Sequence, residues 1–189
     1  SSDLILSPEA SIQINSGTFL GWCSGYCSHN LELDNGSVSF IASGFGVYGD
    51  DLTEIFLEDN LNQDTWQQLV ELIDFEYFQS LDDIYGYPNS DDASAEYIEI
   101  IYNGVSKEVI FDADSEVSGI EELTLLLREL REDYQNQAKC YIEPVVGPCD
   151  GICPTYYFNQ NTDQCEEYIT GCCGIEAFNT MGACQNACE

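Results

Sequence analysis

The sequence predicts an α+β fold in two parts, an N-terminal antiparallel sheet with two helices followed by a small disulfide-rich module. Two Asn-Gly pairs, each set between alternating apolar segments, are typical of β-hairpins. Two other segments carry apolar residues at helical spacing. Eight of the ten cysteines fall within the last fifty residues, a length too short for a stable core without cross-links. We therefore expect domains at residues 1–136 and 137–189.

Strands are expected where apolar and polar residues alternate in the N-terminal domain. These segments cover residues 12–14, 31–33, 38–40, 55–57, 97–102 and 107–111. The pairs Asn35-Gly36 and Asn103-Gly104 each stand between two of them, at positions that suit a tight hairpin turn. Two antiparallel hairpins are therefore predicted.

The first predicted helix covers residues 62–74. Its apolar residues recur at i, i+3, i+4 and i+7, which places them on one face. They are Trp66, Leu69, Val70 and Ile73. Either Asn62 or Asp64 is expected to cap its N-terminus.

The second predicted helix covers residues 119–133. The residues expected to face the core are Ile120, Leu123, Leu127 and Leu130. Glu121 and Glu122 would stand in the first turn, and Arg128 and Arg131 in the last. Both placements are favourable to the helix dipole.

The chain carries 35 acidic and 4 basic residues, for a formal net charge of −31. Such a surface repels nucleic acid and anionic membranes, so neither is an expected partner. It suits a saline environment, where screening relieves the repulsion, and it would also attract a basic partner. No apolar run reaches the roughly 18 residues of a membrane span, so an integral membrane protein is not predicted.

The density of cysteines predicts an oxidising location: secreted, periplasmic or at the cell surface. The first residues, Ser1-Ser2-Asp3, read as a mature or trimmed terminus from which an export signal has been removed. A lipid anchor upstream of Ser1 is compatible with this interpretation.

Cys23 and Cys27, with His29 nearby, have two interpretations. Such a group can be half of a metal site or a redox pair, or else a short structural disulfide. His29 is the chain's only histidine, so a tetrahedral zinc site lacks ligands. We expect the disulfide Cys23–Cys27 and no metal. Because this one histidine is expected in a loop beside the disulfide, no Ser-His-Asp or Cys-His nucleophile is expected, and neither an enzyme nor a cofactor is predicted.

Four acidic loops offer the oxygen ligands that calcium prefers. They are Asp50-Asp51, Asp82-Asp83, Asp91-Asp92 and residues 112–116. None fits the twelve-residue calcium-loop pattern, because the last has Val117 in place of the required glycine and Leu123 in place of the required glutamate. We interpret all four as solvated surface.

Several motifs occur together in the N-terminal domain. Residues 21–27 (Gly-Trp-Cys-Ser-Gly-Tyr-Cys) precede the first hairpin, residues 78–85 follow the first helix, and Asp91-Asp92 precede the strands that carry Gly104 and Lys107. In this combination the domain resembles one found in exported bacterial proteins and lipoproteins of unknown function. The resemblance implies no activity.

A cysteine frame dominates the C-terminal domain. Its members are Cys140, Cys149, Cys165, Cys173, Cys184 and Cys188. Intervals of nine and sixteen residues and a final four-residue step form a specific combination, and residues 156–159 (Tyr-Tyr-Phe-Asn) supply an aromatic strand. Residues 140–189 thereby resemble the Kunitz-type (pancreatic trypsin inhibitor) domain. The resemblance implies a twisted hairpin of residues 154–159 and 165–170 and a helix at 181–188.

The resemblance also implies a disulfide pairing. Its three bridges are Cys140–Cys188, Cys149–Cys173 and Cys165–Cys184. Cys153 and Cys172 are surplus to the frame, and they fall close together in the family hairpin, so a fourth bridge Cys153–Cys172 is expected. Because Cys172 and Cys173 are adjacent, the swapped pairs Cys149–Cys172 and Cys153–Cys173 stay open.

Two loops follow from the same resemblance. The reactive loop consists of Pro148, Cys149, Asp150, Gly151 and Ile152. The secondary loop consists of Thr170, Gly171, Cys172 and Cys173. In inhibitory relatives the residue after the second frame cysteine enters the primary specificity pocket of the protease, and here that residue is Asp150. Aspartate suits neither trypsin, whose pocket holds a carboxylate, nor the apolar pockets of chymotrypsin and elastase. A protease that cleaves after acidic residues stays open.

The secondary loop departs from the family pattern. The family has glycine where Cys172 stands and usually an aromatic residue where Thr170 stands. The interval from Cys173 to Cys184 is two residues shorter than usual, and residues 176–178 replace the usual buried asparagine. The leading hypothesis is a secreted Kunitz-type serine protease inhibitor with Asp150 as its specificity residue. The alternative is a non-inhibitory binding or structural module of a secreted or cell-surface protein.

Overall fold

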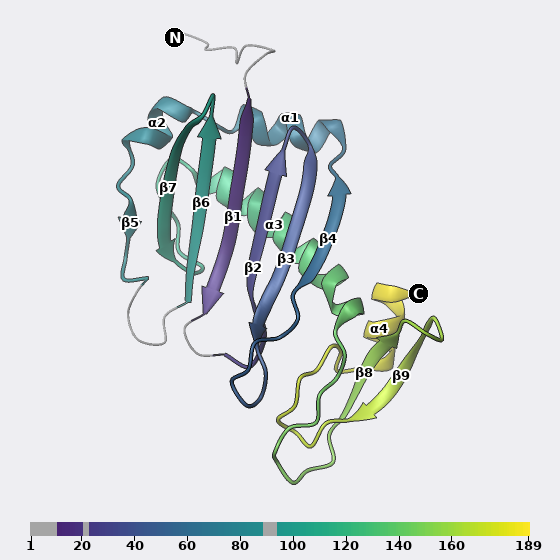
Figure 1. Cartoon of the computed structure of the whole chain (residues 1–189). Coiled ribbons are helices and arrows are strands. Elements are labelled where there is room, and N and C mark those ends of the chain that lie inside the picture. Colours follow the sequence, from purple (N-terminus) through teal and green to yellow (C-terminus); the bar gives the residue numbers. More distant parts are fainter. Residues whose placement is uncertain (1–10, 21–22, 89–93) are drawn as a thin grey trace.

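The computed structural model describes residues 11–20, 23–88 and 94–189, and its N-terminal part is built on one seven-stranded sheet (Figure 1). The strand order is β4-β3-β2-β1-β6-β7-β5. The strands are β1 Ile12–Leu20, β2 Gly25–Asp34, β3 Ser37–Phe45, β4 Ile55–Asn60, β5 Ile84–Tyr85, β6 Ser94–Tyr102 and β7 Val105–Asp112. Neighbouring strands are antiparallel except β5 and β7, which are parallel. The predicted antiparallel sheet is confirmed, and the two-residue β5 is an addition to it.

Both predicted hairpins are present, and their turns explain the Asn-Gly pairs. Asn35 and Gly36 have φ values of 51° and 86°, and Asn103 and Gly104 have φ values of 50° and 81°. Two successive residues with positive φ make the turn whose twist matches that of the flanking strands. Asparagine and glycine tolerate this conformation better than other residues.

One face of the sheet packs against a long helix, α3 (Glu121–Ala138), which crosses it diagonally (Figure 1). The residues that form this layer are almost fully buried. They include Ile14, Leu31, Phe40, Ile98 and Phe111 from the strands and Leu123 and Leu127 from the helix. The core therefore lies between the sheet and α3.

The first predicted helix is present but shorter than expected, and a second short helix follows it. Helix α1 (Gln63–Glu71) begins after Asn62, whose side chain accepts a hydrogen bond from the Thr65 N–H at 2.8 Å. Asn62 is thus the cap, and Asp64 lies in the first turn. Asp74 caps a second helix, α2 (Phe75–Ser80), by accepting from the Tyr77 N–H at 3.0 Å. The helix predicted over 62–74 is therefore confirmed as α1, although it ends earlier, at Glu71, and α2 was not predicted.

The second predicted helix ends five residues later than expected, at Ala138 instead of residue 133. Its buried face continues through Arg131, Tyr134 and Ala138. The placement of Arg128 and Arg131 in its last turn was wrong, since no basic residue stands in that turn of α3. Arg131 is 6% exposed and belongs to the core, and a buried ion pair, described below, allows a charged residue there.

The C-terminal part is the predicted disulfide-rich module. After the short 3-10 helix η1 (Lys139–Tyr141), β8 (Pro154–Asn159) and β9 (Gln164–Ile169) form a twisted hairpin, and α4 (Met181–Cys188) closes the chain beside the end of α3 (Figure 1). Buried residues of both parts belong to one apolar cluster. The boundary at 136/137 stays a prediction, because α3 runs through it.

Within the described ranges, no helix combines the length and the apolar character needed to cross a membrane.

Candidate functional site

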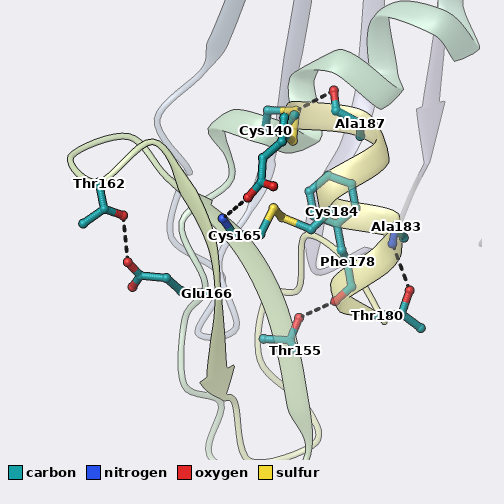
Figure 2. Close-up of a disulfide and its surroundings, with 12 residues drawn as sticks. Cys140, Thr155, Thr162, Cys165, Glu166, Phe178, Thr180, Ala183, Cys184 and Ala187 are labelled. Atoms are coloured by element: carbon teal, nitrogen blue, oxygen red, sulfur yellow. Dashed lines mark hydrogen bonds between the residues drawn. A yellow bond between two sulfur atoms is a disulfide. The ribbon is translucent and has the colours of Figure 1, made fainter.

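The C-terminal hairpin is fastened to its helix by both covalent and polar links. Figure 2 shows the Cys165–Cys184 disulfide between β9 and α4, and the Thr155 hydroxyl donating to the Phe178 carbonyl at 3.0 Å. Thr180 caps α4 by accepting from the Ala183 N–H at 3.1 Å. These links fix the far end of the module, so the loops at the other end rest on a rigid base.

Five disulfides join all ten cysteines of the chain. They are Cys23–Cys27, Cys140–Cys188, Cys149–Cys173, Cys153–Cys172 and Cys165–Cys184. Of the two arrangements that the adjacent Cys172 and Cys173 allow, the structure contains the one with Cys173 bonded to Cys149. Two bridges therefore tie the reactive loop to the secondary loop.

The predicted reactive loop, residues 148–152, is largely exposed. Cys149 and Asp150 are exposed, and Ile152 is 86% exposed. Gly151 between them is half-buried. Among the described residues, no hydrogen bond or ion pair engages the Asp150 carboxylate. A partner would therefore meet a free carboxylate and an exposed isoleucine on one short segment.

The secondary loop packs against the predicted reactive loop and is joined to its flanks by backbone hydrogen bonds. Thr170 is fully buried, and its N–H donates to the Cys153 carbonyl at 3.1 Å. Its own carbonyl accepts from the Gly147 N–H at 2.9 Å. Gly171 has a φ of 78°, and a Cβ atom there would lie 2.6 Å from the Cys149 carbonyl oxygen. The small residues of this loop thus allow the two backbones to approach closely.

The shortened interval before Cys184 is closed by backbone pairing. Val145 and Ile175 form an isolated antiparallel bridge, and so do Tyr156 and Phe178. Phe178 is 7% exposed, so it fills the module's small core, whereas Glu176 is exposed. Backbone pairing thus anchors the segment in which the usual asparagine is missing.

A cavity of about 440 Å³ separates the secondary loop from the N-terminal sheet. Cys172, Ile175 and Glu176 line one side, and Tyr26 and His29 line the other. Both parts of the chain therefore contribute to the surroundings of the disulfide-bonded loops.

His29 occupies a structural position in the N-terminal sheet. Its ring stacks on Phe40 at 5.9 Å between centroids, and its Nδ1 lies 3.3 Å from the Thr18 hydroxyl. Burial, together with the positive charges of Arg131 and Lys139, lowers the pKa of His29 to about 4. The imidazole is therefore neutral at pH 7.

No cluster of metal-ligating side chains occurs within the residues that the structure describes. The 112–116 loop is held by protein groups: the Asp112 side chain accepts from the Tyr87 N–H at 2.9 Å, and the Ser115 carbonyl accepts from Arg128 at 2.7 Å. Asp50, Asp51, Asp82 and Asp83 are exposed. Asp91-Asp92, and the Gly21-Trp22 part of the N-terminal motif, lie outside the described residues.

Sequence reasoning missed a buried ion cluster of Glu96, Arg128 and Arg131. Glu96 is 3% exposed, and Arg131 Nη2 donates to it at 2.6 Å. Arg128 Nε donates to both Glu96 oxygens, at 3.0 and 3.1 Å. The signal was present, because Glu96 shares the inward parity of Ile98 and Ile100 on one strand. An acidic residue at an inward position requires a buried cation.

Comparisons with known proteins match the C-terminal module. A model of the Kunitz/Bovine pancreatic trypsin inhibitor domain matches residues 139–189. A carboxypeptidase inhibitor from Sabellastarte magnifica is 38% identical over 63 residues, which are 32% of this chain and 38% of that protein. The chain therefore spans little more than a third of this relative.

Two sea-anemone relatives are covered more completely. KappaPI-actitoxin-Avd3a from Anemonia sulcata is 41% identical over 51 residues, which are 26% of this chain and 82% of that protein. PI-actitoxin-Aeq3c from Actinia equina is 37% identical over 57 residues, which are 29% of this chain and 100% of that protein. Most or all of these two small proteins therefore corresponds to one part of this chain.

Proposed function

Since this chain belongs, through residues 139–189, to the Kunitz/bovine pancreatic trypsin inhibitor family, we propose that it inhibits a serine protease with Asp150 as the specificity residue. The observation that carries the proposal is the exposed Asp150 in a loop cross-linked to its neighbour by two disulfides. A loop that is ordered before binding loses little conformational entropy when it docks. The bond between Asp150 and Gly151 is called the reactive bond below.

The charge of Asp150 selects the class of protease. A pocket that carries its own carboxylate would bury two like charges together, and an apolar pocket would desolvate one charge without a partner. A pocket lined by basic or hydrogen-bonding groups compensates the carboxylate. The expected target is therefore a serine protease that cleaves after acidic residues.

The cysteines of the chain support an oxidising location. All ten cysteines are in disulfides, which persist in oxidising compartments. We therefore place the protein outside the cytosol, as a secreted or surface-held inhibitor and not as an enzyme, with lipid anchoring upstream of Ser1 still a proposal. The likeness of the N-terminal sheet to a domain of exported bacterial proteins rests on its motifs alone.

One observation favours a second function. Cys172, Ile175 and Glu176 border the cavity shared with the N-terminal sheet. A protease that also contacts the secondary loop would have to fit beside that sheet. A non-inhibitory module that binds another protein, or simply braces the N-terminal part, is the alternative.

Inhibition constants for the full chain would separate the two functions. Trypsin, chymotrypsin, elastase and a Glu/Asp-specific serine protease are the panel, and slow, tight inhibition of the last alone is expected. Asp150→Asn keeps the size of the side chain and removes its charge, so it should weaken that inhibition. Asp150→Lys should transfer inhibition to trypsin.

The inhibitor hypothesis would be rejected if neither the wild type nor Asp150→Lys inhibited any of the four proteases. Mass spectrometry must first verify all five disulfides in both proteins. The remaining function would then be that of a module that binds another protein or stabilises the N-terminal part. Inhibition of trypsin by Asp150→Lys, without any inhibition by the wild type, would mean that the loop is competent and the proposed target class is wrong.

A further inference from the structure

Two adjacent cysteines of the secondary loop hold the two flanks of the reactive bond. Cys173 is bonded to Cys149, one residue before Asp150, and Cys172 is bonded to Cys153, two residues after Gly151. The Cα–Cα distances across these bridges are 5.8 and 4.8 Å. Both sides of the reactive bond are therefore anchored in one dipeptide.

The Cys153–Cys172 bridge also lies directly against the reactive bond. A Cβ atom on Gly151 would lie 2.3 Å from Cys172 Sγ and 3.1 Å from Cys172 Cβ. The first distance is far below any ordinary contact between nonbonded heavy atoms. The sulfur therefore fills the space beside Gly151, and only glycine fits there without displacement.

Cys172 holds this position in an unfavourable backbone conformation. Its φ is 70°, in the left-handed region that glycine adopts readily and cysteine does not. An unbonded, exposed cysteine would gain little in return for this conformation. The cross-link to Cys153 is the interaction that distinguishes this residue from a glycine.

Hydrogen bonding alone leaves the segment after the reactive bond weakly held. Strand β8 begins only at Pro154, so Gly151 and Ile152 precede the ladder. The bond from the Thr170 N–H to the Cys153 carbonyl, at 3.1 Å, is the first backbone link on that side. The disulfide adds a covalent link at the same residue.

We infer that the Cys153–Cys172 disulfide is a clamp that keeps the cleaved ends of the reactive bond together, so that the bond re-forms and the loop stays an inhibitor. The inference rests on the proposed function, because it takes the Asp150–Gly151 peptide as the bond that a protease attacks. Hydrolysis adds one water, leaving a carboxylate on Asp150 and an amino group on Gly151. Resynthesis on the bound protease is the reverse and releases that water.

The geometry sets the distance over which the ends can separate. Asp150 remains one residue from the bridged Cys149, and Gly151 two residues from the bridged Cys153. A chain extends at most about 3.3–3.6 Å per residue, so the new amino group stays within roughly 7 Å of the Cys153 backbone. Ends held this closely react as if at high concentration, which favours resynthesis.

The test removes the clamp and leaves the rest of the frame. In the full chain, Cys153→Ala is combined with Cys172→Gly, which suits the positive φ at residue 172. The Glu/Asp-specific protease is added in catalytic amount, and the ratio of cleaved to intact reactive bond is measured at equilibrium, approached from both forms. The ratio should rise several-fold in the variant, because the tether of Gly151 then extends to the start of β8 and the effective concentration of the amino group falls.

A matched control removes a different bridge. Cys23→Ser with Cys27→Ser deletes the N-terminal disulfide and should leave the ratio unchanged. Non-reducing mass spectrometry and thermal unfolding verify the fold of each variant. If the Ala/Gly variant does not fold, Cys153→Ser with Cys172→Gly is used, and hydrogen exchange of residues 150–153 is measured alongside, where faster exchange than in the wild type is expected.

The outcomes separate this inference from the proposed function. Equal ratios with tight inhibition by both proteins would support the inhibitor and overturn the clamp. If neither protein inhibits, but the wild type reaches a mixture of cleaved and intact chains that shifts to full cleavage in the variant, the inhibitor is overturned, and the bridge is still shown to hold the cleaved ends together. Complete cleavage of the wild type itself would overturn the clamp, because it would show that the bridge does not hold the ends together.

Discussion

Glu96 of β6 and Arg131 of α3 form a buried ion pair, in which Arg131 Nη2 donates to Glu96 Oε2 at 2.6 Å. Their side chains are only 4% and 8% exposed. Arg131 Nη1 also donates to the Ser16 hydroxyl of β1, and the Asp114 N–H donates to Glu96 at 3.0 Å. The pair therefore links the sheet, the helix and the 112–116 loop at one point.

Neutralising Glu96 should strongly destabilise the chain. Glu96→Gln leaves Arg131 buried without a counter-charge, and breaking a buried pair in this way typically costs about 3–5 kcal/mol. The free energy of unfolding, from urea denaturation at pH 7, measures the loss. Arg128→Gln is the matched control, because the Arg128 side chain is 25% exposed and its loss should cost less. Equal losses from the two variants would contradict the central place given to Arg131.

The pH dependence of stability should contain a separate contribution from His29. Its folded-state pKa of about 4 lies below the ordinary value of 6.5, so only the unfolded state takes up a proton between these values. The contribution is therefore fully present above about pH 6.5 and is lost as the pH falls toward 4. The loss should reach about 2 kcal/mol after allowance for partial exposure.

The contribution of His29 is measured as the difference in the free energy of unfolding between the wild type and His29→Gln. Stability curves of wild type and His29→Gln are measured from pH 4 to 8, because the acidic surface has a pH dependence of its own. The wild type should lose stability relative to the variant below pH 6.5. Burial opposes ionisation of Glu96, but hydrogen bonds from Arg128, Asp114 and Arg131 outweigh it and lower its pKa. Its contribution is thus lost only at lower pH, and parallel curves from pH 4 to 6.5 would contradict the role given to His29.

The predictable parts of the fold were those encoded over a few neighbouring residues. The Asn-Gly turns and the alternating strands are such local patterns, and the structure follows them. The cysteine frame spans residues 140–188 and was predicted instead from its resemblance to a family. The end of α3 was missed because Arg131 resembles a solvent-exposed residue until its partner Glu96, 35 positions away, is known. The early end of α1 and the short helix α2 were missed because Asp74 fits the end of a helix as well as the cap of a new one.

Only part of the candidate site could likewise be predicted from the sequence. The reactive and secondary loops were predicted from the family resemblance and stay predictions, whereas the cavity beside Cys172 depends on how two parts of the chain pack. The contact between Gly151 and Cys172 Sγ is likewise invisible in the sequence, because 21 positions separate the two residues. Family patterns did not supply it either, since the family has glycine at position 172.

Salt should stabilise this protein. A net charge of −31 repels itself most in the compact state, and the screening length falls from about 30 Å at 0.01 M to about 3 Å at 1 M salt. Relief of even 1 kcal/mol would raise the melting temperature by about 2–4 °C for a chain of this size. Thermal unfolding in sodium chloride and in choline chloride measures the effect. A melting temperature that does not rise in either salt would refute it, and a rise in sodium alone would indicate specific ion binding.

Substitution of Gly151 should be harmful only while the Cys153–Cys172 bridge is present. Gly151 does not have a positive φ, so alanine meets no backbone obstacle there. Its Cβ would nevertheless lie 2.3 Å from Cys172 Sγ, and such overpacking typically costs about 1–3 kcal/mol. Gly151→Ala should destabilise the wild type by this amount and should be nearly neutral when Cys153→Ala and Cys172→Gly are present.

A double-mutant cycle on the free energy of unfolding isolates this coupling, which should fall in the range of about 0.5–3 kcal/mol expected for residues in contact. Gly182→Ala is the matched control, because nothing lies within 4 Å of a Cβ at that position in α4. It should be neutral or slightly stabilising in both backgrounds, since alanine favours a helix over glycine. If Gly151→Ala cost the same with and without the bridge, the contact with Cys172 would not be what requires glycine beside the reactive bond.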